Sequence, residues 1–512
     1  MRNDSDLPSA IRRLLFEAGL EVDPPYERRI FTNRDLNFDA IPVVGFDMDY
    51  TLAMYNQEAM EEVSIACTVD KLLSRGYPGE LKDAAPDPRF AIRGLMVDKV
   101  LGNVLKQDRH GYVGRVFHGR SKLSRDERKA TYRAQRLGQE RERFAPVDTL
   151  FALPEVTLYA QMVEFIDRRP DLWNGSAPSY GEAWADVRAC IDEAHRDGSI
   201  KEQIKANPGR YIVRDPDLAA TLHKFRSAGK RLFLLTNSLF PYTDAVMHHL
   251  LDGSLASYGE WRAYFDWVVV GSRKPEFFTH GRAFQELDDA GNPVGSPKQR
   301  IQRGKVYSEG NQIGLQESIG VHGDEVVYVG DHIYGDIVRS KKSSGWRTAL
   351  IVQELEQDLQ VRRTHGLMLR EIENLYRLRS ELATAVSAQR HLSRTLARLS
   401  PEELIGAGLT PETAAKALDD ARNHVRRRFD GLRRYQQQTT ETLEERATDV
   451  DEAFNPYWGS AFAERYDTSR FGAQVEFYAC IYTSRVSNFL YVSPSTYFHS
   501  PHGWLPHWSN GS

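Results

Sequence analysis

Short apolar runs that end directly in polar residues recur along this chain. Four of them are typical of strands buried on both faces of a parallel sheet, and they span residues 41–46, 231–235, 266–270 and 325–329. Helical patterns lie between them, such as residues 217–229, which close on a glycine as helix C-termini often do. This alternation predicts an α/β fold on a Rossmann-like parallel sheet, in which ligands bind beyond the carboxyl ends of the strands.

The distance between the first two strands predicts an inserted domain. Roughly 185 residues separate them, far more than one crossover connection needs. From residue 115 to 210 the chain is charged and rich in helix-compatible residues, with an apolar helix expected at 158–166. We therefore assign residues 1–114 and 211–355 to the core, and 115–210 to an inserted, mainly helical cap.

The pattern changes again after the last strand. From about residue 356 to 449 the chain is rich in Arg and Glu, its apolar residues recur at helical spacing, and Ser400 begins a fresh helix. These features predict a long helical hairpin within a helical C-terminal extension, residues 356–512, that packs on the core. The arginine-rich stretch 422–428 could contact nucleic acid, but a solvated charged face is the commoner explanation.

Composition limits the partners. The 512 residues are 41% hydrophobic and carry a formal net charge of -4, so bulk charge favours neither nucleic acid nor an anionic membrane. No run of 18 or more apolar residues occurs, and the N-terminus lacks the apolar core of a signal peptide. Three widely spaced cysteines fit a reducing compartment. We expect a cytoplasmic protein that binds neither nucleic acid nor membrane.

Carboxylates cluster at the ends of two of the predicted strands. Asp47 and Asp49 follow the first strand and point the same way if strand geometry persists. Asp331 and Asp336 follow the last strand, so four carboxylates could converge where their mutual repulsion requires a cation. Magnesium suits a site with few carboxylates and with room for water and phosphate oxygens.

A single polar residue at a strand end carries little information. An aspartate there is more often a turn residue or a helix cap. Thr236 alone could also be a cap, and Lys274 alone, before Pro275, could be a solvated loop charge. Their joint occurrence at the strand ends of one α/β array is better explained by an active site.

The order of these motifs resembles the haloacid dehalogenase superfamily of phosphatases. Four segments carry the resemblance: DMDYT from Asp47, LTNS from Leu235, RKP from Arg273 and GDHIYGD from Gly330. The resemblance implies that the core is of the haloacid dehalogenase type. It also implies that the phosphoryl group passes through a covalent aspartyl phosphate.

The superfamily resemblance implies a role for each motif residue. Asp47 would attack phosphorus, while Asp49 would protonate the leaving oxygen and later activate water. Thr236 and Lys274 would hold the phosphoryl oxygens as their charge shifts, and Asn237 would orient the site.

The same resemblance implies a ligand set for Mg²⁺. The ion would be held by the Asp47 carboxylate, the Asp49 backbone carbonyl and Asp331. Asp336 would be a further acidic residue beside this set.

More narrowly, the chain resembles the cytosolic purine 5′-nucleotidases of the IMP/GMP-preferring type. The similarity covers most of the chain, including DMDYTLAMY from Asp47. It implies that Phe151 stacks on the purine while Arg188, Asp192 and Lys201 read its edge. Arg and Lys can donate to O6 and N7, Asp can accept from ring N–H groups, and adenine would fit worse. Without the resemblance, these residues would be read as a charged helix and a core Phe.

We therefore expect a magnesium-dependent 5′-nucleotidase that hydrolyses IMP, GMP and their deoxy forms. Phosphotransferase activity follows if the hydroxyl of a nucleoside acceptor replaces water. The family's nucleotide effector site is only partly matched, since Tyr334 and Lys342 are compatible with it but Asp148 and Gly138 are not clear matches. The resemblance also implies a homotetramer.

Two other functions stay open. A phosphatase of the same superfamily could act on a different phosphate monoester. A non-catalytic regulatory or scaffold protein could carry a phosphorylatable Asp and bind a partner through the helical region from about residue 356. Asp49 and Lys274, which a passive binder does not require, count against the scaffold.

Overall fold

The computed structural model describes residues 24–83, 87–133, 142–173, 175–297, 300–333 and 345–501. It divides the chain into two compact units, one of residues 1–359 with 461–512 and the other of residues 360–460. Four of the residues named above lie outside the described part: Gly138, Tyr334, Asp336 and Lys342. None of the described helices combines the length and the apolar character needed to cross a membrane.

A mixed sheet forms the centre of the first unit. Its ten strands within the described residues are, in spatial order, β1 (Phe31–Thr32), β20 (Ile481–Thr483), β17 (Arg347–Ile351), β16 (Val326–Gly330), β3 (Val43–Phe46), β11 (Arg231–Leu235), β12 (Trp267–Val270), β15 (Val306–Glu309), β13 (Phe284–Leu287) and β14 (Pro293–Gly295). The strands from β20 to β15 run parallel, while β1, β13 and β14 pair antiparallel at the edges. The α/β fold and the four predicted buried strands, now β3, β11, β12 and β16, are confirmed.

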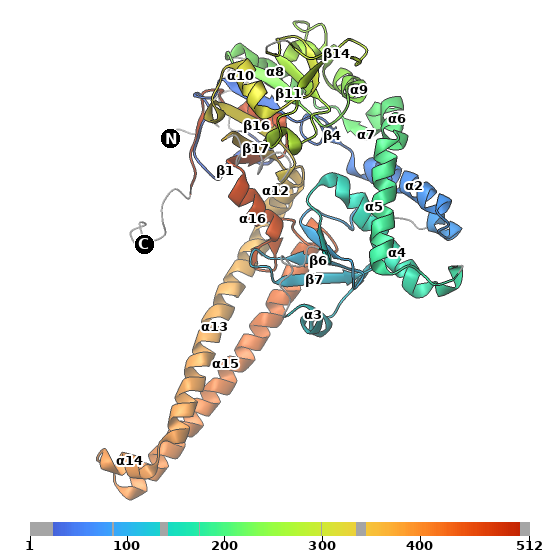
Figure 1. Ribbon diagram of the computed structural model, residues 1–512. Coiled ribbons are helices and arrows are strands. Elements are labelled where there is room, and N and C mark those ends of the chain that lie inside the picture. The colour runs from blue at the N-terminus through green and yellow to red at the C-terminus, as the bar shows by residue number, and fades with distance from the viewer. Residues whose placement is uncertain are drawn as a thin grey trace. The chain divides into compact units, whose positions relative to one another are not determined.

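Helices and aromatic side chains cover this sheet. Three helices lie around it in Figure 1: α8 (Leu218–Ser227), α9 (Phe240–Leu251) and α10 (Gln312–Ile319). Phe233, Trp267, Tyr328 and Trp346 belong to one buried cluster on the sheet. The apolar runs of the sequence thus become strands with both faces buried, which leaves the strand ends as the places for polar chemistry.

The insert begins earlier than the sequence suggests. Strands β4 (Met54–Tyr55) and β10 (Ile212–Val213) pair antiparallel, so the chain leaves the core and returns to it at the same place. The insert therefore spans residues 56–211, whereas the sequence predicts that it begins at residue 115. Its helices are α2 (Gln57–Ser74), α3 (Arg125–Tyr132), α4 (Leu153–Arg168), α5 (Tyr180–Arg196), α6 (Ser199–Ala206) and α7 (Pro208–Tyr211). The insert is mainly helical, as predicted.

The insert also contains an antiparallel sheet that the sequence did not predict. Its strands, in spatial order, are β8 (Ser121–Lys122), β7 (Val113–His118), β6 (Asn103–Gln107), β5 (Leu95–Asp98) and β9 (Phe144–Pro146). Two of these strands, β5 and β6, lie before residue 115 and would have been assigned to the core. They pair with later segments of the insert, and this pairing places them in it.

Glu61, on α2, provides a pH test of how the insert packs. Its carboxylate accepts hydrogen bonds from Gln57 and from Thr157 of α4, at 3.1 and 3.2 Å. Burial raises the pKa of Glu61 to about 7, so the folded chain binds a proton there that the unfolded chain releases near pH 4.5. The free energy of unfolding should therefore fall as pH rises from about 4.5 through 7.

We expect Glu61→Gln to remove this part of the pH dependence, which is worth ~3 kcal/mol at pH 8. Urea unfolding of the two proteins at pH 5 and pH 8 measures it. Glu58→Gln on the exposed face of the same helix is the control. It should leave the change of unfolding free energy with pH as in the wild type. Parallel stability curves for wild type and Glu61→Gln would contradict the prediction.

The C-terminal tail belongs to the core, which corrects the expected helical extension over residues 356–512. Strand β20 lies within the main sheet beside β17, and helix α16 (Arg470–Tyr478) precedes it. Two short antiparallel pairs complete the tail: β18 (Ala463–Glu464) with β19 (Asp467–Thr468), and β2 (Leu36–Asn37) with β21 (Tyr497–Phe498). Two-residue and three-residue strands are too short to show an alternating pattern, so the sequence did not reveal them.

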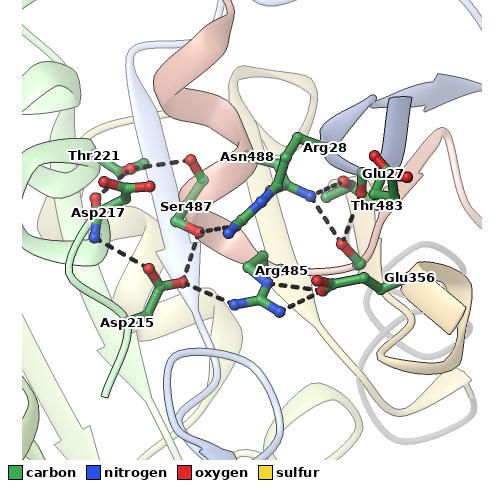
Figure 2. Close-up of polar contacts among 11 residues, drawn as sticks. Glu27, Arg28, Asp215, Asp217, Thr221, Glu356, Thr483, Arg485, Ser487 and Asn488 are labelled. Carbon is green, nitrogen blue, oxygen red and sulfur yellow. Dashed lines mark hydrogen bonds and ion pairs between the residues drawn. The ribbon is translucent and has the colours of Figure 1, made fainter. Parts of the chain in front are cut away.

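A polar network holds the tail against the core (Figure 2). Arg485 donates to Glu356 and lies 3.8 Å from the Asp215 carboxylate, which also accepts from Ser487 at 2.6 Å. Arg28, on the 3₁₀ helix η2 (Tyr26–Arg28), donates to Ser487 and to Asn488 at its side-chain oxygen. The network joins segments from the beginning, middle and end of the first unit.

The second unit is a helical hairpin. Helices α13 (Gly366–Arg398) and α15 (Pro411–Phe454) lie side by side and antiparallel, and α14 (Pro401–Gly406) lies between them in sequence (Figure 1). Helix α12 (Glu354–Thr364) precedes α13 and crosses the boundary between the units in sequence. Ser400 caps α14 with a capping box, which confirms the predicted helix start.

Candidate functional site

The carboxyl ends of four parallel strands meet at one edge of the main sheet. Strand β3 pairs with both β16 and β11, and β11 pairs in turn with β12. The registers place Phe46 opposite Val329 and Leu234 on its two sides. Asp47, Thr236 and Asp331 each follow one of these strands directly, so they begin at neighbouring positions of the edge.

Asp47 and Lys274 form a buried ion pair at this edge. The Lys274 Nζ lies 2.9 Å from the Asp47 Oδ1, and the same oxygen accepts from the Met48 backbone N–H at 2.7 Å. Lys274 also donates to the Tyr328 hydroxyl at 2.8 Å. Only 8% of Asp47 and 9% of Lys274 is exposed. A cation in this position attracts the negative carboxylate and adds positive charge where a phosphoryl oxygen would lie.

Two hydroxyl groups hold the carboxylate of Asp49. Ser238 donates to one oxygen at 2.8 Å, and Tyr55 donates to the other at 2.6 Å. Because both oxygens are engaged, the Asp49 side chain has a fixed orientation beside Asp47. Asp49 is partly exposed, whereas Asp47 is buried.

Asn237 fixes the loop that carries Lys274. Its side-chain oxygen accepts from the Lys274 backbone N–H and from the Ser272 hydroxyl, and its amide donates to the Lys274 carbonyl at 3.0 Å. The neighbouring Thr236 is fully buried, and its hydroxyl oxygen accepts from the Ser238 backbone N–H at 3.1 Å. The loops after β11 and β12 are thus tied together.

The donor groups at this edge fit a magnesium ion. Asp331 is buried, and its backbone carbonyl accepts from Arg93, which is itself paired with Glu354. The carboxylates of Asp47 and Asp331 follow adjacent strands, which matches the one or two carboxylates that Mg²⁺ commonly takes in proteins. Within the described residues, no cluster of three or more His, Cys, Asp or Glu side chains suits a metal.

An aromatic group lies next to the catalytic candidates. Phe151, on the 3₁₀ helix η4 (Leu150–Ala152), packs edge-on against Tyr50 with ring centroids 4.7 Å apart. The rings of Tyr55 and His195 lie 6.3 and 5.9 Å from it. Phe151 is half-buried, so part of its surface stays open to a ligand.

The other predicted base-reading residues surround the same place. Burial lowers the pKa of His195, with Lys201 lowering it further while Asp192 and Asp49 oppose the shift. Contacts also place Lys201 here, because its ammonium lies 5.2 Å from the centre of the Tyr242 ring. The Tyr242 hydroxyl lies 3.0 Å from that of Tyr55, which donates to Asp49. The structure therefore brings Lys201 of the insert near Asp49 of the core.

Arg188, on the same helix as Asp192 and His195, pairs with a carboxylate of α4. Its guanidinium lies 3.5 Å from the carboxylate of Glu155, on α4, and about half of its side chain is exposed. Burial raises the pKa of Glu155 to about 7, an effect that Arg188 opposes and Asp192 reinforces. Arg188 thus keeps free donors for a ligand while Glu155 limits its freedom.

Sequence reasoning missed several residues of this site. Ser238, Tyr328 and Arg93 hold the motif residues through contacts between distant segments, which no local pattern shows. Tyr55 lies within the first motif, but the sequence does not show that its hydroxyl meets Asp49. His195 had a usable signal, because it follows Arg188 and Asp192 at the spacing of one helical face. Asp336, predicted beside the metal ligands, lies outside the described residues.

Comparisons with known proteins place the chain among nucleotidases. The model of the 5′ nucleotidase family matches residues 30–510. A 5′-nucleotidase domain-containing protein of Dictyostelium discoideum is 28% identical over 93% of this chain and 74% of its own length. The 5′-nucleotidase domain-containing protein 2 of Rattus norvegicus and that of Homo sapiens are each 30% identical over 66% of this chain. These alignments span 62% and 65% of the two mammalian proteins.

The likeness of this chain to solved structures is distant. A HAD phosphatase from Thermococcus onnurineus covers 61% of this chain and 87% of its own, with 16% identity and a TM-score of 0.26. CbbY from Rhodobacter sphaeroides, solved in complex with phosphate, covers 61% of this chain and 86% of its own, with 15% identity and a TM-score of 0.24.

Proposed function

Because this chain belongs to the 5′ nucleotidase family, we propose that it hydrolyses purine nucleoside 5′-monophosphates. Hydrolysis of phosphate monoesters is the reaction class of the family. The preferred substrates are IMP, GMP and their deoxy forms. The observation that carries the proposal is the buried pair of Asp47 and Lys274, with the Asp49 carboxylate held beside it by two hydroxyl groups.

In the first step, a carboxylate oxygen of Asp47 attacks phosphorus and forms an aspartyl phosphate. The bond from phosphorus to the 5′ oxygen breaks, and Asp49 gives its proton to that oxygen as the nucleoside leaves. Lys274 and the Thr236 hydroxyl face the shifting charge on the phosphoryl oxygens. The fixed position of Asp49 matters because proton transfer requires hydrogen-bonding distance to the leaving oxygen.

In the second step, Asp49 takes a proton from water, whose oxygen then attacks phosphorus. The bond to Asp47 breaks and orthophosphate leaves, which restores both side chains. A nucleoside hydroxyl in place of water would give phosphotransfer. Asp47, Asp331 and the Asp49 carbonyl would hold Mg²⁺, which when bound supplies positive charge against the phosphate oxygens. The homotetramer, the nucleotide effector and the cytoplasmic location stay predictions.

The insert supports purine selectivity. Arg188 can donate to O6 and N7 in the plane of the base, Asp192 can accept a ring N–H, and Phe151 offers a stacking face. Lys201 adds a second cation on the same side. The Phe151 ring lies 5.9 Å from that of His195, on the helix that also carries Arg188 and Asp192, and this spacing supports a base-binding role for the insert.

Phosphate release from a panel of monoesters tests this function. We expect the wild type, with magnesium, to hydrolyse IMP and GMP in preference to AMP, UMP and ribose 5-phosphate, and chelation of magnesium to stop it. Arg188→Ala should lower kcat/KM for IMP and GMP about tenfold, mainly through KM, because a donor to the base is lost. Turnover of ribose 5-phosphate, which has no base, should stay the same.

Arg196→Ala is the matched control, since Arg196 is an exposed arginine in the last turn of the same helix, α5. It should behave as the wild type on every substrate. A wild type that leaves IMP and GMP intact in the presence of magnesium would contradict the function. Equal losses on IMP and ribose 5-phosphate in Arg188→Ala would contradict the role given to that residue.

A further inference from the structure

Tyr55 lies where the insert meets the core. It is the last residue of β4 and pairs with Ile212, the first residue of β10, so the insert begins and ends beside it. The next residue, Asn56, donates its backbone N–H to the Tyr211 carbonyl at 2.7 Å, which continues the pairing. Tyr55 is therefore anchored on both sides by backbone hydrogen bonds, and only 1% of its surface is exposed.

The hydroxyl of Tyr55 stands between Asp49 and a second tyrosine. It donates to the Asp49 carboxylate at 2.6 Å and lies 3.0 Å from the hydroxyl of Tyr242, on α9. A phenol has one proton, and Tyr55 uses it on Asp49, so Tyr242 must be the donor to Tyr55. Burial raises the pKa of both phenols, and the charge of Asp49 raises them further, so both hydroxyls keep their protons.

Tyr242 is itself held in place by both parts of the first unit. It is buried on α9 of the core, and the Lys201 ammonium of the insert lies 5.2 Å from the centre of its ring. A cation at this distance over an aromatic ring is attracted to its face. Contacts with neighbouring residues thus hold both ends of the chain of hydrogen bonds that runs from Tyr242 through Tyr55 to Asp49.

We propose that Tyr55 is a positioning residue for the acid and base Asp49, with Tyr242 as its support, and that it ties this carboxylate to the junction of the insert. The inference rests on the function proposed above, in which Asp49 transfers a proton to the leaving oxygen. Ser238 holds the other carboxylate oxygen, so Asp49 keeps one anchor when Tyr55 loses its hydroxyl. The carboxyl group could then rotate away from the leaving oxygen.

Two aryl phosphates of similar shape measure this role in Tyr55→Phe. Phenolate is a strongly basic leaving group that needs a proton, whereas p-nitrophenolate leaves without one. The value of kcat/KM reports only the steps up to departure of the leaving group. We expect kcat/KM to fall tenfold or more for phenyl phosphate and for IMP, less than threefold for p-nitrophenyl phosphate, with KM within twofold of the wild type.

Two more variants separate positioning from general damage to the fold. Tyr242→Phe should show the same dependence on the leaving group, with kcat/KM lowered about threefold. The loss is smaller because Tyr242 acts on Asp49 only through Tyr55. Tyr264→Phe removes another buried phenol hydroxyl, one without a hydrogen-bond partner in the described part of the chain, and should match the wild type. The thermal midpoints of all variants should lie close together.

An equal loss on both aryl phosphates, or no loss in Tyr55→Phe, would overturn the positioning role. The test of Tyr55 can be decided independently of the test of the proposed function. A wild type that hydrolyses aryl phosphates but not IMP would refute purine nucleotide hydrolysis, while the comparison of leaving groups would still decide the role of Tyr55.

Discussion

Replacing Asp47 with Asn is expected to lower turnover of every phosphate monoester by about 10⁴-fold or more. The amide keeps the shape of the side chain but is no nucleophile, so no aspartyl phosphate can form. Phosphate release with magnesium present measures the loss.

Acid quenching during turnover of a ³²P-labelled substrate gives a second measurement. The wild type should carry label on the protein, and Asp47→Asn should carry none. Asp39→Asn is the control, because Asp39 is an exposed aspartate shortly before the same strand. It should leave both activity and labelling as in the wild type. Label bound to the Asp47→Asn protein would show that another residue is the nucleophile.

The centre of the fold could be predicted because its strands are buried on both faces. A strand of this kind is a continuous apolar run, and β3, β11, β12 and β16 all have this form. The polar residue after each run marks the edge of the sheet, so the positions of Asp47, Thr236 and Asp331 followed from the pattern. The registers place these ends next to one another, as a parallel sheet requires.

The boundaries of the insert could not be read in the same way. They depend on the pairing of β4 with β10, two residues each, which lie more than 150 residues apart in the chain. The same holds for β20, whose three residues complete the sheet from the far end of the sequence. Such pairings are decided by tertiary packing and leave no periodic signal.

The supports of the site were hidden for a related reason. Asp49 accepts a hydrogen bond from Tyr55, six positions away, and one from Ser238, 189 positions away. A residue that takes part in the reaction can be predicted from the sequence, because the reaction requires a particular type of side chain. The residue that orients it can be any donor that the fold brings near, which is why the roles of Tyr55 and Tyr328 emerge only from the structure.

Lys274→Met is expected to reduce turnover about 10³-fold and also to lower the free energy of unfolding by about 3 kcal/mol. Methionine fills much of the same space but has no charge, so the carboxylate of Asp47 stays buried without the cation 2.9 Å away. The Tyr328 hydroxyl loses a donor as well. Urea unfolding and steady-state kinetics measure the two effects.

A double-mutant cycle separates the pair from the rest of the site. In an Asp47→Asn background there is no carboxylate to leave unpaired, so Lys274→Met should cost far less stability there than in the wild type. Lys305→Met is the control, because it breaks an exposed pair with Glu286, and exposed pairs of this kind add little to stability. Equal losses of stability in the two backgrounds would mean that Lys274 stabilises the fold independently of Asp47. The buried ion pair would then be a consequence of the fold, and the activity lost in Lys274→Met would have to come from its contact with the phosphoryl oxygens alone.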